Sequence, residues 1–136
     1  RAGGYLTIGG TGLRTFYHHF IGRVSSDKID RYKSLSKEKA FRLEADWLRN
    51  RSSVSSWQTR DEKLERYGGA VLLPISNGGK ESHCIISFSG LLEKVDEAVA
   101  LTLGKDLGFA TDEAIEKIVG ISDNQVFPEM WKAYTS

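Results

Sequence analysis

The sequence predicts an α+β fold, an antiparallel sheet built from two β-hairpins and flanked by helices. Two pairs of β-branched and aromatic segments carry this prediction, residues 5–8 with 13–21 and residues 70–75 with 82–89, and glycines separate the members of each pair. Helical periodicity follows each pair, whereas the single strands alternating with helices that build a doubly wound parallel sheet are missing. The 136 residues, 40% of them hydrophobic, are enough for one domain with its own core.

The first predicted hairpin begins with a short extended run, Tyr5 to Ile8, which stops at a turn over residues 9–12, Gly-Gly-Thr-Gly. Its second strand runs from residue 13 to residue 21, where Gly22 ends it. Alternation with period two divides the side chains of this strand between two faces, and both faces are expected to be partly covered. Phe16, His18 and Phe20 share one face, and Thr15, Tyr17, His19 and Ile21 share the other.

Two helices are predicted after this hairpin. Ser25 and Ser26 are good N-cap residues, so a short turn or helix is expected from there through Tyr32. Ser36 is expected to cap a stronger helix over residues 37–49. The apolar side chains of this stronger helix fall at helical spacing, and its other face is charged. They are Ala40, Leu43 and Trp47, with Phe41 and Leu48 beside them.

The segment before the second hairpin is predicted to hold a loop and a short helix. Residues 52–56 are rich in serine and are expected to form the loop. Thr59 and Glu62 have the spacing of a capping box, which predicts a short helix that ends at Gly68 and Gly69.

The second hairpin is indicated by Asn77-Gly78-Gly79 between residues 70–75 and residues 82–89. Pro74 lies in the first of these strands and has no amide hydrogen to donate. It therefore belongs at a sheet edge, at a bulge or at a gap that faces a ligand.

Three helical segments are predicted after the second hairpin. The longest covers residues 92–107, with an apolar stripe of Val95, Val99, Leu103 and Leu107 and with Ala98 and Leu101 alongside it. Thr111 is expected to cap a shorter helix that ends at Gly120. Pro128 is expected to begin a last helical turn.

Composition excludes several classes of protein. No apolar run approaches the roughly 20 residues of a membrane span, so no membrane association is expected. The single cysteine, Cys84, permits no internal disulfide and favours a reducing compartment, here the cytoplasm. Because the chain begins with Arg1 rather than Met, it is expected to be a trimmed form, and a removed signal or transit peptide stays possible.

Charge is distributed unevenly along the chain. Residues 1–66 carry 14 Lys and Arg against 8 Asp and Glu, whereas residues 67–136 carry 5 against 10. Such a division either steers an anionic ligand, pairs subunits, or is neutralised within one fold. Acidic residues interleave with the basic ones between Lys33 and Arg51, which favours a solvated helix face over nucleic-acid binding.

No catalytic or metal-binding motif is present, so enzyme activity is neither indicated nor excluded. His18 and His19 are neighbours on a strand and point to opposite faces, so they cannot chelate one ion together, and no metal site is expected. Either histidine, or Tyr17, remains a possible axial ligand of haem, which needs only one or two protein bonds. The alternative is a hydrogen-bonded imidazole.

Two segments of the chain resemble a known family. Residues 67–75, Tyr-Gly-Gly-Ala-Val-Leu-Leu-Pro-Ile, are followed by residues 85–91, Ile-Ile-Ser-Phe-Ser-Gly-Leu, and then by Asp96-Glu97. This order is similar to that of the GlcG/HbpS-like superfamily, often labelled the haem-degrading domain. Lys39-Ala40 falls in a helix where that family carries a Lys-Ala pair. The spacer between Gly69 and Pro74 is longer than in the family pattern.

The resemblance implies a profilin-like domain over residues 1–108 that lacks the family's N-terminal helix. Residues 109–136 then form a helical extension packed on the same domain. It also implies a homo-oligomeric binding or sensory protein whose ligand is haem or a small organic acid.

The candidate ligand-binding residues combine charge, backbone shape and hydroxyl groups. They are Lys39, Gly68, Gly69, Pro74, Ser87 and Ser89. Lys39 is expected to neutralise an anionic group, the glycines and the proline to shape the backbone around it, and the serines to offer hydroxyls.

Two other functions stay open at this point. The first is an enzyme of the haem-degrading, lyase or isomerase type that uses a histidine, or Lys39 with Asp96, as acid and base. The second is an assembly subunit whose C-terminal extension docks on a neighbour. A burial-shifted pKa at Lys39 favours the first, and the lack of a pocket near Lys39 favours the second.

Overall fold

A computed structural model describes residues 2–10, 15–77 and 80–136 and confirms the α+β fold with an antiparallel sheet. Its four strands lie in the order β2-β1-β4-β3, and every neighbouring pair is antiparallel. The strands are β1 (Gly3–Gly10), β2 (Thr15–Gly22), β3 (Ala70–Asn77) and β4 (Lys80–Ser89). The two predicted hairpins therefore exist, and β1 and β4 join them into one sheet. Parts of both predicted turns lie outside the described residues.

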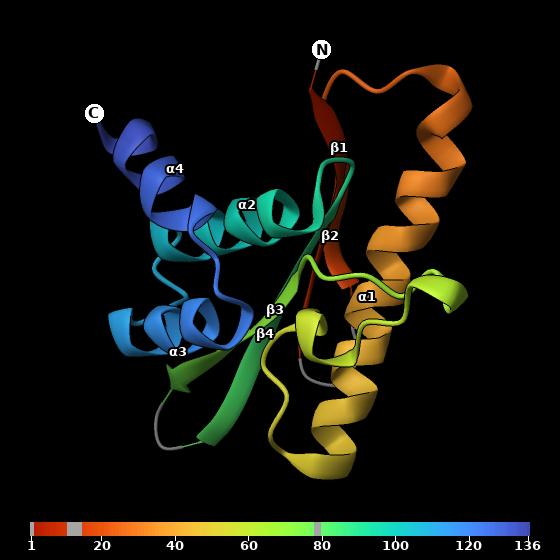
Figure 1. Cartoon of the computed structure of the whole chain (residues 1–136). Helices are drawn as coiled ribbons and strands as arrows, with labels where there is room; N and C mark the ends of the chain where they lie inside the picture. Colours follow the sequence, from red (N-terminus) through yellow and green to blue (C-terminus); the bar gives the residue numbers. More distant parts are fainter. Residues whose placement is uncertain (1, 11–14, 78–79) are drawn as a thin grey trace.

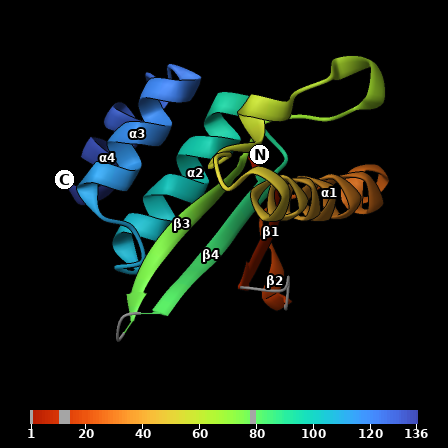
Figure 2. The ribbon, with the colours of Figure 1, turned by 90° about the horizontal axis from the view of Figure 1, so that it is seen from below.

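Helices cover both faces of the sheet (Figures 1 and 2). One face carries α1 (Ile29–Asn50) and the other carries α2 (Glu93–Asp106). The alternation along β4 shows this, because the Ser87 hydroxyl reaches α1 while Ile86 lies against Gly104 of α2. α4 (Val126–Thr135) lies outside α2, and α3 (Asp112–Ser122) lies beside it, where it also contacts β3 (Figure 1). None of the described helices is long and apolar enough to cross a membrane.

The first helix is longer than predicted. A 3-10 turn, η1 (Ser26–Lys28), leads into α1, and the two predicted helical pieces form one helix of 22 residues. Ser36 lies in its middle rather than at its start and is fully buried. Its hydroxyl donates to the Ser87 carbonyl at 3.2 Å and meets the Thr7 hydroxyl at 2.9 Å. A residue type that favours caps is here used to attach the helix to the sheet.

The segment between α1 and β3 also differs from the prediction. The capping box is formed by Ser55 and Gln58, and two 3-10 turns, η2 (Ser56–Thr59) and η3 (Glu62–Leu64), replace the predicted helix. The Arg42 guanidinium donates to the carbonyls of three residues in this segment, Ser56, Thr59 and Tyr67. These bonds hold the segment against α1 where a regular helix was expected.

The buried face of α2 is centred on the residues predicted beside the stripe rather than on the stripe itself. Leu107 is 48% exposed, and Val99 is only half-buried, whereas Ala98 and Leu101 are fully buried. Because α2 contacts the sheet on one side and α3 and α4 on the other, small residues between the stripe positions are enclosed as well. Gly104 allows the closest approach, since a Cβ there would lie 2.5 Å from the Leu73 side chain.

The C-terminal helices begin at caps. Thr111 caps α3 through a bond from the Ala114 amide, as predicted, although the helix runs two residues past Gly120. α4 begins at Val126 rather than Pro128. The reason is Asn124, whose side-chain oxygen accepts hydrogen bonds from two amides at the start of α4.

The expected partial covering of both faces of β2 holds for one face only. Phe20 is half-buried and packs edge-on against the Tyr5 ring, whereas the face of Tyr17 and Ile21 is uncovered. Tyr17 and Ile21 are 43% and 44% exposed, and both histidines of this strand are exposed. β2 is an outer strand of the sheet. α2 packs over β3 and β4, at the other side of the sheet, and so leaves this face of β2 uncovered.

Candidate functional site

Lys39 is the centre of the candidate site. It belongs to the face of α1 that packs on the sheet, and it is only 1% exposed. Its ammonium donates to the Gly68 carbonyl at 3.1 Å, to Asp96 Oδ2 at 3.3 Å and to the Phe88 carbonyl. An ammonium group has three protons, so the protein itself provides an acceptor for each of them.

Gly69 leaves room for this ammonium. Its φ angle is +126°, and a Cβ placed on it would lie 2.5 Å from Lys39 Nζ and 2.8 Å from the Phe88 carbonyl oxygen. Gly68 is similar, because a Cβ there would lie 2.9 Å from the Trp57 ring. Both glycines therefore accommodate other parts of the protein, and neither provides open space for a ligand.

Burial changes the ionisation of both members of the ion pair. Burial lowers the pKa of Lys39 because it penalises the charged form, and attraction to Asp96 opposes this shift. Burial also raises the pKa of Asp96 to about 6, against the attraction of Lys39 and a hydrogen bond from the Leu91 amide. The free-energy cost of removing both charges from water is thus larger than the free energy gained from their attraction.

A cavity of about 260 Å³ opens beside the pair. Its walls come from α1, from the end of β4 and from the start of α2, and they include Tyr32, Leu35, Ser89 and Leu92. Ser89 is 4% exposed, and its hydroxyl makes no hydrogen bond with the part of the chain that the structure describes. It is therefore a donor available to a ligand in the cavity.

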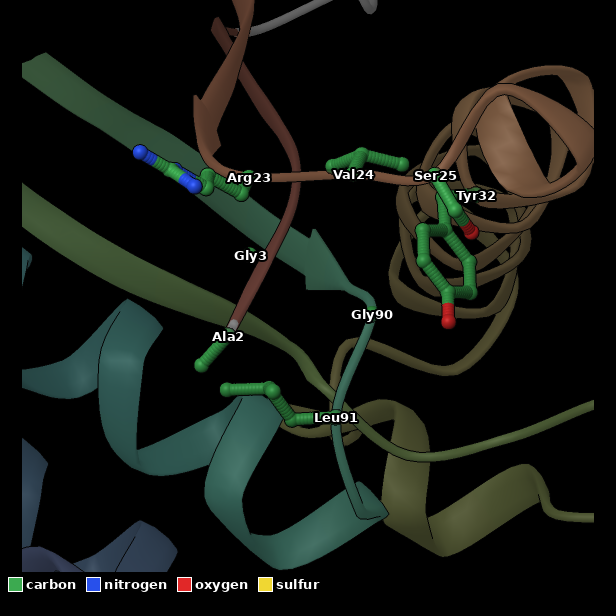
Figure 3. A pocket seen from close by; sticks show the side chains of 8 residues that line it. All are labelled: Ala2, Gly3, Arg23, Val24, Ser25, Tyr32, Gly90 and Leu91. Carbon is green, nitrogen blue, oxygen red and sulfur yellow. The ribbon is translucent and has the colours of Figure 1, made fainter.

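A second hollow of about 440 Å³ adjoins this cavity and shares Tyr32, Gly90 and Leu91 with it. Figure 3 shows that Tyr32 projects from α1 toward the strand end at Gly90 and that Arg23 comes from the segment after β2. The two hollows form one cleft along the end of the sheet.

Most charges around the cleft are paired. Arg31 contacts Glu65 at 2.6 Å, and Arg60 contacts Glu93 at 2.7 Å. Arg23 forms no ion pair with any described residue. With Lys39 and Asp96 balancing each other, the cleft keeps one cation in excess, which favours an anionic ligand.

The structure brings together four of the residues predicted from sequence, Lys39, Gly68, Gly69 and Ser89, and adds Asp96 as their partner. Two others lie elsewhere. Pro74 is exposed on the outer strand β3, five residues beyond Gly69, at one of the three kinds of position predicted for it. Ser87 donates its hydroxyl hydrogen bond to the Ser36 carbonyl under α1.

Tyr17 and its two neighbours His18 and His19 lie on β2, outside this cleft. His18 Nδ1 hydrogen-bonds to the Tyr5 hydroxyl, and His19 Nδ1 donates to the Phe20 carbonyl at 2.9 Å. Within the described residues, no three His, Cys, Asp or Glu side chains converge on a position for a metal ion.

Sequence reasoning missed Arg23, Tyr32 and Tyr67 as lining residues. Tyr32 was expected only at the end of a short helical turn, and nothing in its neighbourhood distinguishes it from a surface residue. Its position in the cleft follows from the continuation of α1 through Ser36.

Comparison of the chain with protein-family models, with curated proteins and with solved structures gives no match in any of the three. The function is therefore argued from the geometry of the cleft together with the sequence resemblance.

Proposed function

We propose that the cleft binds a small carboxylic acid and that binding is coupled to uptake of a proton by Asp96. The observation that carries this proposal is a fully buried lysine at the wall of a cavity, whose counter-charge is a carboxylate with a pKa raised to about 6. The resemblance to GlcG/HbpS-like proteins, with haem or a small organic acid as ligand, agrees with it.

The coupling follows from the three donors of Lys39. While Asp96 is ionised, each Lys39 proton has a protein acceptor, and the ammonium has none to offer. Once Asp96 takes up a proton, the charge of Lys39 is no longer compensated in its buried position. A ligand carboxylate that enters the cavity restores the balance and gains a charge-assisted hydrogen bond.

The other walls define the ligand further. The Ser89 hydroxyl can donate a second hydrogen bond. Arg23 contributes positive charge only from the adjoining hollow, because its guanidinium is directed away from Gly90 and Tyr32 (Figure 3). Leu35 and Leu92 provide apolar contact for a short hydrocarbon body. The class that fits is a small organic acid with one carboxylate directed inward.

Calorimetric titration with acetate, propionate and succinate at pH 6 and pH 8 tests the proposal. We expect tighter binding at the lower pH, and a loss of about tenfold or more in affinity in Lys39→Met, because a hydrogen bond to a charged group is removed. Ser89→Ala is expected to weaken binding less and to keep the fold.

Lys33→Met is the matched control, because Lys33 lies on the exposed side of the same helix. It is expected to bind like the wild type. Equal affinity and equal salt dependence of the wild type, Lys39→Met and Ser89→Ala would contradict the proposal.

Acid–base catalysis by Lys39 and Asp96 is a second candidate function. The observation that favours it is that burial moves both pKa values toward neutrality, as in many catalytic pairs. A neutral lysine accepts a proton from carbon next to a carbonyl, and a protonated Asp96 donates one to the product. Incubation of small 2-oxo acids with the protein in D₂O tests this candidate, with deuterium incorporation expected in the wild type and lost in Asp96→Asn.

Haem binding remains a proposal for the far side of the sheet. The observation in its favour is that His19 is exposed and bonds through Nδ1, so that Nε2 has no hydrogen-bond partner among the described residues, as in a metal-ligating imidazole. His19 shares its face of β2 with Ile21, which lines an apolar cavity of about 270 Å³. An absorbance titration with haemin is expected to lose its Soret shift in His19→Ala and to keep it in His18→Ala.

A further inference from the structure

The two outer edges of the sheet differ in how they are protected. The β3 edge is shielded, because Leu72 donates its amide to the Val54 carbonyl at 2.9 Å and Ser55 forms a bridge with Val71. Pro74 adds a position that cannot donate. The outer edge of β2 pairs with nothing in the described part of the chain. Residues 15–22 contain no charged residue and no proline, which are two of the usual means of preventing edge association. A third, a β-bulge, lies at the start of the strand, where the pairing with β1 shifts register between Tyr17 and Thr15, before the segment from Tyr17 to Ile21.

Apolar side chains continue from this edge across the sheet. Tyr17 and Ile21 are exposed and lie on the face of β2 that is shared with Ile8 and Phe88. Ile21 is also at the rim of the apolar cavity of about 270 Å³, whose far wall is α4. The uncovered half of this face is thus bordered by a strand edge on one side and by a helix on the other (Figure 2).

We propose that a second copy of the chain covers this edge, with the two β2 strands paired antiparallel across a two-fold axis into an eight-stranded sheet. An isologous contact requires a surface that complements itself, and an unprotected antiparallel edge does so. The net charge of +1 gives little repulsion between copies. This interface is separate from the cleft at Lys39 and does not rest on the proposed carboxylic acid, whereas it would compete with haem for the face of His19 and Ile21.

The side chains select a register. When the two-fold axis is perpendicular to the sheet, the α2 helices of both copies lie on the same face of the eight-stranded sheet. Odd-numbered residues of one β2 strand then lie opposite odd-numbered residues of the other. With the axis at His19, Tyr17 lies opposite the partner's Ile21, and Ile21 lies opposite the partner's Tyr17. These are two aromatic–β-branched pairs on the α2 face, next to the apolar cavity of each copy.

The strength of the contact is expected to be modest. One strand edge with two cross-strand pairs buries less than the roughly 1,200–2,000 Å² of a stable standard interface. The dissociation constant is therefore expected on the order of micromolar, and the mass should depend on protein concentration.

Light scattering coupled to size exclusion over a hundredfold range of concentration is the first test. We expect the mass to rise from 15.2 kDa toward twice that value. Tyr17→Lys places a charge in both symmetric pairs and should weaken the dimer about tenfold or more. Leu48→Lys is the control, because Leu48 is 55% exposed on α1, and it should dimerise like the wild type.

Cross-linking tests the register. In His19→Cys the two Cβ atoms are expected about 5 Å apart, within reach of a disulfide under mild oxidation or of a short bis-maleimide. Tyr17→Cys places its thiols four residues apart along the strands and should not cross-link. Cys84 is buried and does not interfere. A mass of 15.2 kDa at every concentration, or a dimer that Tyr17→Lys leaves intact, would overturn the proposal.

Discussion

A side chain at position 69 would enter the space that the Lys39 ammonium occupies. The backbone there has φ +126°, which is strained for any residue other than glycine, and the nearest groups are the ammonium and a backbone carbonyl. A lysine can be buried at this point because the neighbouring residue has no side chain. The glycine and the lysine therefore depend on each other.

Gly69→Ala is expected to lower the free energy of unfolding by roughly 2–4 kcal/mol, from backbone strain together with overpacking. Gly120→Ala is the matched control, because nothing lies within 4 Å of a Cβ at this helical position. It is expected to stabilise the protein by roughly 0.5–1 kcal/mol. Urea denaturation of both variants measures the two effects, and equal midpoints would contradict the account of Gly69.

The raised pKa of Asp96 predicts how stability depends on pH. Between the ordinary carboxyl pKa of 3.8 and the folded value of about 6, the folded state binds more protons than the unfolded state. The free energy of unfolding should therefore fall as the pH rises from about 4 to about 6, by up to about 3 kcal/mol. The lowered pKa of Lys39 acts at the alkaline end, where stability rises toward the ordinary lysine pKa.

Urea titrations across this pH range in the wild type and in Asp96→Asn measure the effect. In Asp96→Asn the free energy of unfolding is expected not to show this decline, because an amide does not titrate in this pH range. Asp112→Asn is the control, because the Asp112 side chain is 74% exposed, and it should keep the decline. A decline of equal size in Asp96→Asn would show that another group is responsible.

Asn124 determines how α3 and α4 are joined. It is fully buried, its oxygen accepts from the Val126 and Phe127 amides, and its nitrogen donates to the Lys94 carbonyl and to Glu97. One side chain thus caps α4 and attaches it to α2. Removal leaves several buried polar groups without partners.

Asn124→Ala is expected to cost roughly 2–4 kcal/mol of unfolding free energy, because a cap and two buried hydrogen bonds are lost. Asn124→Asp keeps the cap but places a carboxylate beside the carboxylate of Glu97, and it should be at least as harmful at neutral pH. Thermal denaturation measures both variants. An unchanged melting temperature in Asn124→Ala would contradict the role of this residue.

The elements that were predictable from sequence are those set by local pattern. Alternation and glycines located both hairpins, and Thr111 marked the start of α3, because these signals act over a few neighbouring residues. The errors occur where tertiary contacts decide. Ser36 hydrogen-bonds to two strands, and Arg42 holds the segment after α1 against that helix. Neither contact can be predicted from the neighbouring residues in the sequence.

The same division applies to the candidate site. Lys39 and Ser89 were predictable as site residues from a motif, and they do meet at one cavity. Pro74 does not, because the five residues that separate it from Gly69 carry it along an extended strand away from the cleft. Arg23 and Tyr32 reach the cleft only because α1 is continuous and because β2 and β4 finish at the same end of the sheet, on either side of the start of β1.

At the scale of the whole chain, the basic and acidic halves partly neutralise each other within the fold. Lys39 pairs with Asp96, and Arg60 pairs with Glu93, so these ion pairs join the first half of the chain to the second. Both reach the wall of the cleft, because Lys39, Glu93 and Asp96 line it. The charge division seen in the sequence is therefore in part a property of the core contacts.

The two helical layers share one hydrophobic core through β4. Ile85 faces α1 and Ile86 faces α2, both are fully buried, and the core continues through Leu101 to Ile118 of α3 and Phe127 of α4. Unfolding of the outer layer would expose the face of α2 that the sheet cannot cover. The whole chain should therefore unfold as one cooperative unit, with residues 109–136 included.

Two tryptophans report on the two sides of the sheet, since Trp47 belongs to α1 and Trp131 to α4, and both pack against the core. A Trp47→Phe/Trp57→Phe variant leaves Trp131 as the reporter, and a Trp57→Phe/Trp131→Phe variant leaves Trp47. Each variant serves as its own reference, because circular dichroism of the same sample follows the whole fold. The urea midpoint of fluorescence is expected to match that of circular dichroism in both. A Trp131 transition that precedes loss of the sheet would instead make residues 109–136 a separately unfolding unit, attached to a domain that keeps its core without them.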